Sequence, residues 1–293
     1  MASEKRTYTY KAVGECEIRA DVYQAAGNAP RPVVVWVHGG ALVTGHRDNL
    51  RAWERDLYLG AEYHVVSIDY RLAPETKLPA IIEDLQNACR WVKEAGPDLF
   101  GADPRRIAVI GHSAGGYLAL VSGFRVDPRP SALVVFYGYG DIAGKWYSHP
   151  DPFYRKQPTV SEEEAWASVG QSVISGTKEN EKRHRFYLYC RQQGLWPKHV
   201  AGYDPDLEPE ALARFCPVRN VTSDYPPTLL LHGDQDKDVP YQQSEMMAAE
   251  LTKAGVENEL AIIPGAEHGF DVEGRETTVS AARRVLAFLR AHL

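Results

Sequence analysis

Six short apolar segments alternate along this chain with stretches of helical periodicity, and this alternation constrains the fold more than any other feature. The first segment, PVVVWVHGG, is apolar on both faces, and the others repeat that pattern. A strand of this kind belongs inside a sheet that is covered on both sides. The six segments occupy residues 32–40, 63–70, 106–112, 131–138, 226–233 and 257–265.

The stretches between these segments predict amphipathic helices. Residues 79–96 are the clearest case, since apolar residues recur there every three or four positions, with polar side chains on the opposite side. Buried strands that alternate with such helices predict an α/β fold, a mostly parallel sheet of about eight strands flanked by helices. Ahead of them, residues 7–23 predict a hairpin around Gly14. Helical periodicity also marks residues 48–61, 114–125, 240–254 and 276–291.

One region interrupts the alternation. Residues 140–225 lack a buried-strand pattern, are divided by seven prolines and hold 12 of the chain's 30 Phe, Trp and Tyr residues. We therefore expect a core formed by residues 1–139 and 226–293, with residues 140–225 inserted as a helical cap. Most of the aromatic side chains of this region are expected to pack within the cap, and a few to line a substrate cleft.

The junction between one strand and the following helix is unusually short. In RIAVIGHSAGGYLAL, residues 106–120, a buried strand runs into Gly111-His-Ser113-Ala-Gly115 and then directly into a helical pattern. Gly-x-Ser-x-Gly in this position is typical of a nucleophile elbow, a tight turn that presents a serine hydroxyl at the carboxyl edge of the sheet. Glycine at 111 and 115 fits this turn because side chains there would collide with the neighbouring backbone.

A serine hydroxyl needs a general base, and the base needs a carboxylate that orients it. On this kind of sheet the two partners follow the serine at the ends of later strands, acid first and histidine second. Three acids, Asp234, Asp236 and Asp238, follow the strand at 226–233, and His268 follows the strand at 257–265. Spacing alone leaves the choice among the acids open. For the general base, the one other histidine that follows these acids in the sequence is His292, near the chain end.

The reaction also needs hydrogen-bond donors for the negative charge that develops on the carbonyl oxygen. The sequence His38-Gly39-Gly40-Ala41 ends an inner strand, and glycines let backbone N–H groups approach that oxygen. The N–H of Ala114, at the start of the following helix, is a further candidate because the helix dipole favours negative charge there.

Charge and composition narrow the partners. A formal net charge of −6 argues against nucleic acid as the main partner. The first residues lack the apolar core of a secretory signal, and no stretch approaches the roughly 18 apolar residues of a membrane span. The cysteines form no Cys-x-x-Cys pair, so we expect free thiols and a cytoplasmic location. The four cysteines are Cys16, Cys89, Cys190 and Cys216.

With these motifs the chain resembles the α/β-hydrolase serine esterases, and in particular the hormone-sensitive lipase family of carboxylesterases. Besides the Ser113 elbow and the His-Gly-Gly loop, residues 69–92 carry that family's Tyr-Arg-Leu-Ala-Pro-Glu signature. The resemblance covers about residues 30–138 and 226–293. It implies that Asp236 is the triad acid, and that backbone N–H groups of the loop and of the residue after the serine form the oxyanion hole. The implied oxyanion and substrate-binding residues are Gly39, Gly40, Ala41 and Ala114.

The chain also departs from the family pattern. Ala41 stands where a third glycine is usual, and His112 replaces the acid that usually precedes the serine, as in peptidase-like relatives. The signature residues Arg71 and Glu75 are expected to brace the oxyanion loop without taking part in catalysis. We expect the segment at 140–225 to serve as the lid, so the substrate preferences of the family's usual cap do not transfer.

The leading hypothesis is a serine hydrolase that cleaves small carboxylic esters through an acyl-enzyme, without a cofactor, with Ser113, His268 and Asp236 as the triad. A peptidase or amidase on the same fold is the alternative, favoured by His112. A ligand-binding protein on an inactive hydrolase fold is less favoured because no triad member is missing. We expect no metal, since the hydrolase interpretation already accounts for His38, His232 and the acids after the strands. Two copies of the chain could pair as a homodimer through the helices at 240–254 and 276–291 or through the last strand.

Overall fold

The structure, a computed structural model, describes residues 5–27 and 29–293 and is built around one eight-stranded sheet. The strand order is β1-β2-β4-β3-β5-β6-β7-β8. The predicted hairpin is confirmed, since β1 and β2 pair antiparallel, and β2 also runs antiparallel to β4. All later pairs are parallel, which confirms the predicted α/β-hydrolase architecture. The strands are β1 (Lys5–Val13), β2 (Cys16–Tyr23), β3 (Arg31–Val37), β4 (His64–Ile68), β5 (Ala102–His112), β6 (Ala132–Phe136), β7 (Thr228–Gly233) and β8 (Asn258–Ile263).

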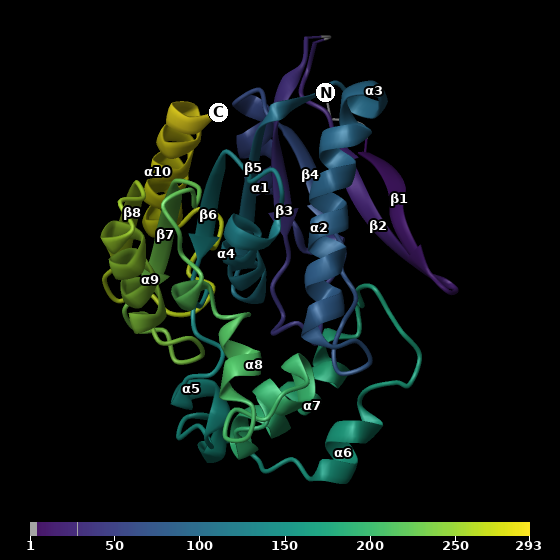
Figure 1. Cartoon of the computed structure of the whole chain (residues 1–293), viewed down its shortest axis with the longest axis vertical. Coiled ribbons are helices and arrows are strands. Elements are labelled where there is room, and N and C mark those ends of the chain that lie inside the picture. The colour runs from purple at the N-terminus through teal and green to yellow at the C-terminus, as the bar shows by residue number, and fades with distance from the viewer. Residues whose placement is uncertain (1–4, 28) are drawn as a thin grey trace.

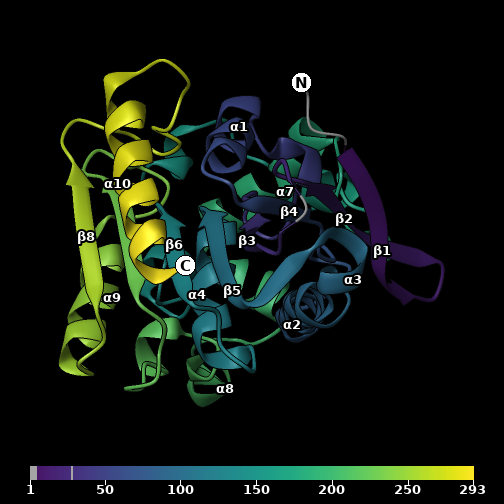
Figure 2. The same cartoon turned by 90° about the horizontal axis from the view of Figure 1, so that it is seen from above.

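Helices cover both faces of this sheet because its inner strands are apolar on both sides. In β3, Val35 and Val37 pack in the larger of two buried clusters, whereas Val34 and Trp36 pack in the other. Viewed from above, α1 and α10 lie on one face of the sheet and α2, α4 and α9 on the other (Figure 2). These helices are α1 (Ala52–Gly60), α2 (Leu78–Glu94), α4 (Ala114–Arg125), α9 (Gln242–Lys253) and α10 (Glu276–His292).

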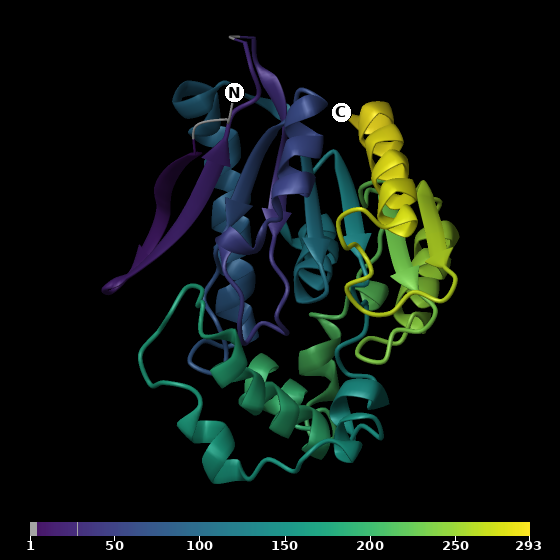
Figure 3. The same ribbon diagram turned by 180° about the vertical axis from the view of Figure 1, so that it is seen from behind.

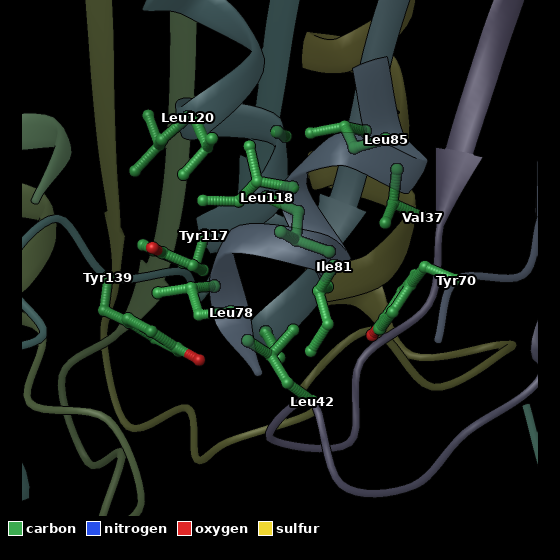
Figure 4. Packing of buried hydrophobic residues seen from close by; sticks show 14 of the residues in the cluster. Val37, Leu42, Tyr70, Leu78, Ile81, Leu85, Tyr117, Leu118, Leu120 and Tyr139 are labelled. Carbon is green, nitrogen blue, oxygen red and sulfur yellow. The ribbon is translucent and has the colours of Figure 1, made fainter. Parts of the chain in front are cut away.

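The larger cluster shows why the sequence folds this way locally. Side chains spaced by three and four residues along α2, such as Leu78, Ile81 and Leu85, point into the same interior as Leu118 of α4 and Val37 of β3 (Figure 4). All five are fully buried. Burying such side chains stabilises the fold by roughly 1.5–3 kcal/mol each. The dense packing fixes the end of β3, where the His-Gly-Gly loop begins.

Two details differ from the sequence-based expectation. The last apolar run predicts a strand with both faces covered, yet the side chains of β8 are mostly only half-buried. The reason is that β8 is an edge strand of the sheet, so only β7 pairs with it. A short helix, α3 (Gly96–Phe100), also follows α2 where no helix is expected.

Between β6 and β7 the described chain forms only short helical elements and one longer helix, α7. Figures 1 and 3 show this segment gathered beyond one end of the strands. We propose that it is the cap of the molecule, as the sequence predicts. None of the helices in the described ranges is long and apolar enough to cross a membrane. The elements of the segment are α5 (Lys145–Ser148), η2 (Tyr154–Lys156), α6 (Glu162–Ala167), α7 (Asn180–Gln193), η3 (Pro197–Ala201), α8 (Pro209–Ala213) and η4 (Pro217–Arg219).

Candidate active site

Ser113 occupies the turn between β5 and α4, in a backbone conformation that few residues adopt. Its φ of 54° and ψ of −118° hold the residue outside the usual regions. A Cβ on Gly111 would lie 2.0 Å from the carbonyl oxygen of Gly115, and a Cβ on Gly115 would lie 2.1 Å from that of Val37. Both glycines are therefore required for the turn to form.

Three side chains from different strand ends meet at this turn. The Nε2 atom of His268 lies 3.1 Å from Oγ of Ser113, and its Nδ1 lies 2.7 Å from Oδ2 of Asp236. Both distances permit hydrogen bonds, with the serine hydroxyl donating to Nε2 and Nδ1–H donating to the carboxylate. The arrangement has the connectivity of a serine hydrolase triad.

The structure distinguishes the three acids that follow β7. Asp236 is fixed by two backbone N–H groups, those of Asp238 and Val239, which donate to Oδ1 at 2.8 Å. Burial alone would raise the pKa of Asp236, but hydrogen bonds from His232 and His268 outweigh it and hold this pKa well below its ordinary value. Asp234 instead accepts a hydrogen bond from the backbone N–H of Gly265.

His268 stands among several carboxylates. Burial tends to lower its pKa, but Asp238, Asp236 and Asp271 together raise the pKa of His268 above its ordinary value of 6.5. Its side chain is 25% exposed, so substrate can reach it. A neutral imidazole in this position can act as a general base, and a raised pKa makes it a stronger one.

The predicted oxyanion loop lies beside the serine. A Cβ on Gly39 would come within 3.3 Å of Cβ of Ser113, so this loop passes very close to that residue. Gly40 has a φ of 106° and Ala41 a φ of 54°, both left-handed. Gly39, Gly40 and Ala41 line the same cavity as Ser113 and His268. Ala114 is the first residue of α4 and is buried directly behind the serine.

Contacts from the cap segment hold this loop in place. Arg183 of α7 donates to the carbonyl oxygens of Val43 and Ala73 at 2.6 and 2.7 Å, and it pairs with Glu75 at 2.7 Å. Trp196 donates from Nε1 to the carbonyl oxygen of Ala41 at 3.0 Å. Glu75 of the family signature therefore supports the predicted oxyanion loop through Arg183.

Arg71, the other signature residue, makes different contacts from those expected. It binds Asp84 through two guanidinium nitrogens, each 2.7 Å from a carboxylate oxygen, and donates to the carbonyl oxygen of Ala80. Both partners lie on α2, one turn apart, so Arg71 anchors the signature segment to that helix. Among the described residues it makes no hydrogen bond to the predicted oxyanion loop.

A second group of charged side chains lies beside Ser113 and lines the same cavity. His112 Nε2 is 3.2 Å from Oδ2 of Asp271 and 3.5 Å from Oε1 of Glu54, and all three residues are buried. Burial lowers the pKa of His112, but Glu54 and Asp271 outweigh it and raise this pKa above its ordinary value. Arg51 adds a guanidinium 2.6 Å from Oδ2 of Asp271.

This second group is also the one set of possible metal ligands within the described ranges, with ligand atoms of Glu54, His112 and Asp271 within 4.8 Å of one another. The guanidinium of Arg51 already binds the Asp271 oxygen that would face an ion. The imidazole of His112, whose pKa is raised, lies within 3.5 Å of both carboxylates, so cationic side chains already lie beside them. The arrangement therefore favours an ion-pair cluster over a cation site.

A cavity of about 640 Å³ opens over the serine, within the range typical of small-molecule sites. Core and cap segment both line it, the cap segment through Tyr154 and Tyr187 among others.

Sequence reasoning missed Arg183, which no local pattern marks. It also missed Glu54 as a partner of His112, although an acid on the apolar side of an otherwise amphipathic helix is a signal that could have found it.

Comparison with known proteins gives relatives of two kinds. The non-reducing polyketide synthase adrD of Penicillium rubens is 28% identical over 342 residues, a match that covers 99% of this chain but 14% of the synthase. Esterase LipC of Mycobacterium tuberculosis is 30% identical over 269 residues, covering 89% of this chain and 58% of LipC. This chain thus spans a small part of the synthase and little more than half of the esterase.

Solved structures share the fold at low sequence identity. A Staphylococcus aureus protein of unknown function has a TM-score of 0.81 and 22% identity, with 98% of this chain and 99% of that chain covered. Propionate-bound esterase 2 of Thermogutta terrifontis has a TM-score of 0.71 and 20% identity, covering 99% and 94%. The sequence pattern of the alpha/beta hydrolase fold matches residues 34–272. That match takes in most of the chain and confirms the resemblance seen in its motifs, so this chain belongs to the alpha/beta hydrolase fold family.

Proposed function

We propose that this chain hydrolyses small carboxylic esters, with Ser113 as nucleophile, His268 as general base and acid, and Asp236 as the residue that orients the histidine. One observation carries the proposal. A single imidazole ring lies within hydrogen-bond distance of the serine hydroxyl on one side, at 3.1 Å, and of a buried carboxylate on the other, at 2.7 Å.

Acylation uses these groups in order. Oγ of Ser113 attacks the ester carbonyl carbon while its proton passes to Nε2 of His268, and the carbonyl π electrons move to the oxygen. The oxyanion accepts hydrogen bonds from backbone N–H groups of the Gly39–Ala41 loop and of Ala114. As the tetrahedral intermediate collapses, the bond to the alcohol oxygen breaks and Nε2 returns the proton to that oxygen. Alcohol leaves and the acyl-enzyme remains.

Deacylation repeats these steps with water. Water gives a proton to Nε2 of His268 and attacks the acyl carbon, and the bond to Oγ breaks as the proton moves to Ser113. Asp236 keeps the proton of the neutral ring on Nδ1 throughout, so that Nε2 is free to accept. Each step uses only groups that this chain supplies, and we propose no cofactor.

The size of the cavity and the named relatives support the substrate class. A volume of about 640 Å³ accommodates a small ester. We expect short acyl chains, since the sequence contains no long apolar surface stretch that would bind a lipid interface. The peptidase or amidase alternative is not favoured, because LipC and the Thermogutta terrifontis protein are both named as esterases.

A fluorophosphonate probe tests the proposal. We expect one covalent adduct per chain, located on Ser113 by peptide mass spectrometry, and no adduct on the Ser113→Ala variant. Ser172→Ala, which changes an exposed serine of the cap segment, is the matched control and should label like the parent. If the parent chain takes up no probe and hydrolyses no p-nitrophenyl acetate, the proposal is wrong and a ligand-binding protein becomes the better interpretation.

A further inference from the structure

A carboxylate outside the triad lies in the cavity beside the catalytic histidine. Asp238 lines the cavity with Ser113 and His268. Its Oδ1 atom is fully engaged, since it accepts hydrogen bonds from Tyr154 Oη at 2.8 Å, from Arg191 Nη1 at 2.7 Å and from the hydroxyl of Tyr187. Three donors on one oxygen fix the position of this carboxylate.

The other oxygen of Asp238 has no such partner. Oδ2 lies 3.5 Å from Nε2 of His268, too far for a good hydrogen bond, and no hydrogen bond within the described ranges ends on it. The side chain of Asp238 is 22% exposed and lines the cavity. A rigid carboxylate with one free oxygen is a ready acceptor for a donor on the substrate.

The position of Oδ2 identifies the part of the substrate that it meets. In the proposed reaction Nε2 of His268 returns a proton to the alcohol oxygen, so this oxygen must come within about 3 Å of Nε2. Oδ2 lies 3.5 Å from the same nitrogen. The group that meets Asp238 therefore belongs to the alcohol side of the ester, one or two carbons away from the ester oxygen.

The surrounding charges favour a neutral donor over a cation. Arg191 is buried and already pairs with Asp238 at 2.7 Å, and it also binds Asp151. During the reaction His268 becomes an imidazolium next to Oδ2. An ammonium group on the substrate would then lie beside a second positive charge and raise the energy of the transition state. A hydroxyl group donates to Oδ2 without this repulsion.

We propose that Asp238 selects esters whose alcohol carries a further hydroxyl group next to the ester oxygen, as in monoesters of polyols. This inference rests on the proposed ester hydrolysis and names its substrate class. A hydrogen bond to a charged group typically contributes enough to change a rate about 10- to 100-fold. We expect a preference of that size for 2-hydroxyethyl butyrate over propyl butyrate, which differ by one hydroxyl and one methyl group.

The experiment compares kcat/KM for these two esters, by titration of the butyric acid released, in the parent chain and in Asp238→Asn. In the variant, Arg191 and the two tyrosines should hold the amide oxygen, so that the NH₂ group faces the cavity and the acceptor is lost. The ratio of the two kcat/KM values should fall about 10- to 100-fold. If the substitution alters the pKa or the position of His268, the kcat/KM values of both esters change by the same factor, and this factor cancels in their ratio.

Glu181→Gln is the matched control, because it neutralises another carboxylate that lines the cavity. We expect this variant to keep the parent ratio. A measurement on the parent chain alone covers the case in which Asp238→Asn does not fold. The acyl-enzyme can react with water or with an added alcohol, and the two products can be counted. Ethylene glycol has two hydroxyl groups, so it should react twice as often as 1-propanol by numbers alone. If Asp238 binds the second hydroxyl group, glycol should react more than twice as often.

The outcomes separate the two proposals. If both butyrates are hydrolysed but the ratio is the same in the parent and in Asp238→Asn, or glycol captures no more than its twofold share, Asp238 does not select the alcohol. A fall in the ratio for Glu181→Gln would likewise overturn the assignment to Asp238. If neither butyrate is hydrolysed and Ser113 takes up no fluorophosphonate, the proposed ester hydrolysis fails first, and this inference fails with it.

Discussion

Two histidines lie close to Ser113, each beside buried carboxylates, and His268 is the one whose ring lies within hydrogen-bond distance of its hydroxyl. His268 is 155 positions away in sequence, yet its Nε2 lies 3.1 Å from Oγ. His112 is the immediate neighbour of the serine, yet its ring stacks on Phe136, with ring centroids 4.4 Å apart, and its Nε2 faces Asp271.

The difference follows from the sheet. His112 is the last residue of β5, and its ring lies over the face of the sheet on which Trp36 and Phe136 pack. Ser113 occupies the sharp turn that follows, so its side chain takes a different direction. Two histidines with similar charged surroundings therefore have different expected roles, one in the reaction and one in the ion-pair cluster with Glu54, Asp271 and Arg51. Position in space, and not adjacency in sequence, therefore favours His268 as the proposed base.

The largest expected effect separates the two rings directly. His268→Gln should lower kcat by roughly a million-fold, because a triad acts as a unit and loses its function when the base is removed. His112→Gln should keep most of the activity of each folded molecule, since its ring does not contact the serine. Initial rates on p-nitrophenyl acetate, normalised to the folded fraction, measure both variants.

Comparable losses of activity in the two variants would remove the distinction between the rings. His112→Gln should instead lower stability, since its removal leaves two buried carboxylates to share one arginine. Leaving a buried charge without its partner typically costs about 3–5 kcal/mol. Urea unfolding of both variants supplies this second comparison.

The carboxylates should differ in the same way. Asp236→Asn should lower kcat by roughly ten thousand-fold, because the amide favours the tautomer of His268 that carries its proton on Nε2. Asp271→Asn, the matched change in the other group, should mainly destabilise the fold, since Arg51 and His112 lose their shared partner. Rates per folded molecule and unfolding free energies test the pair, and a ten thousand-fold loss of rate in Asp271→Asn would contradict the separate roles.

Sequence reasoning predicted the fold, which the structure confirms, and it proposed Ser113 and His268 for the triad from local patterns, whereas Asp236 followed from the family resemblance. Buried β-branched runs mark the inner strands, and the strand–Gly-x-Ser-x-Gly–helix junction marks Ser113. The contacts of Arg183 and of Asp238 left no such pattern, because each joins segments that are distant in sequence. Arg183 lies 108 positions from Glu75 and Asp238 lies 47 from Arg191. Such pairings depend on how the cap segment packs on the core, which periodicity does not encode.

The pH dependence of activity extends the comparison to protonation. His268 must be neutral to accept the proton of Ser113, and Asp238, Asp236 and Asp271 outweigh burial to raise its pKa above 6.5. The acidic limb of kcat/KM should therefore have its midpoint above pH 6.5, with a loss of about tenfold per pH unit below the midpoint. This limb should persist in His112→Gln. A midpoint well below pH 6.5 would contradict the raised pKa of His268.

The smallest expected effect concerns His112 and stability. Glu54 on α1 and Asp271 raise its pKa against the opposing effects of burial and of Arg51, so the folded protein binds this proton more tightly than the unfolded chain. A pKa raised by folding contributes stability that is fully present below the unfolded pKa of about 6.5, and that is lost as pH rises through the folded pKa. The difference in unfolding free energy between the parent and His112→Gln should therefore be larger at about pH 6 than at about pH 9. Urea unfolding at both pH values measures this difference in unfolding free energy. The control Ser172→Ala should show no change of the difference with pH. A difference that grows with pH would mean that folding lowers the pKa of His112, and it would contradict the raised pKa.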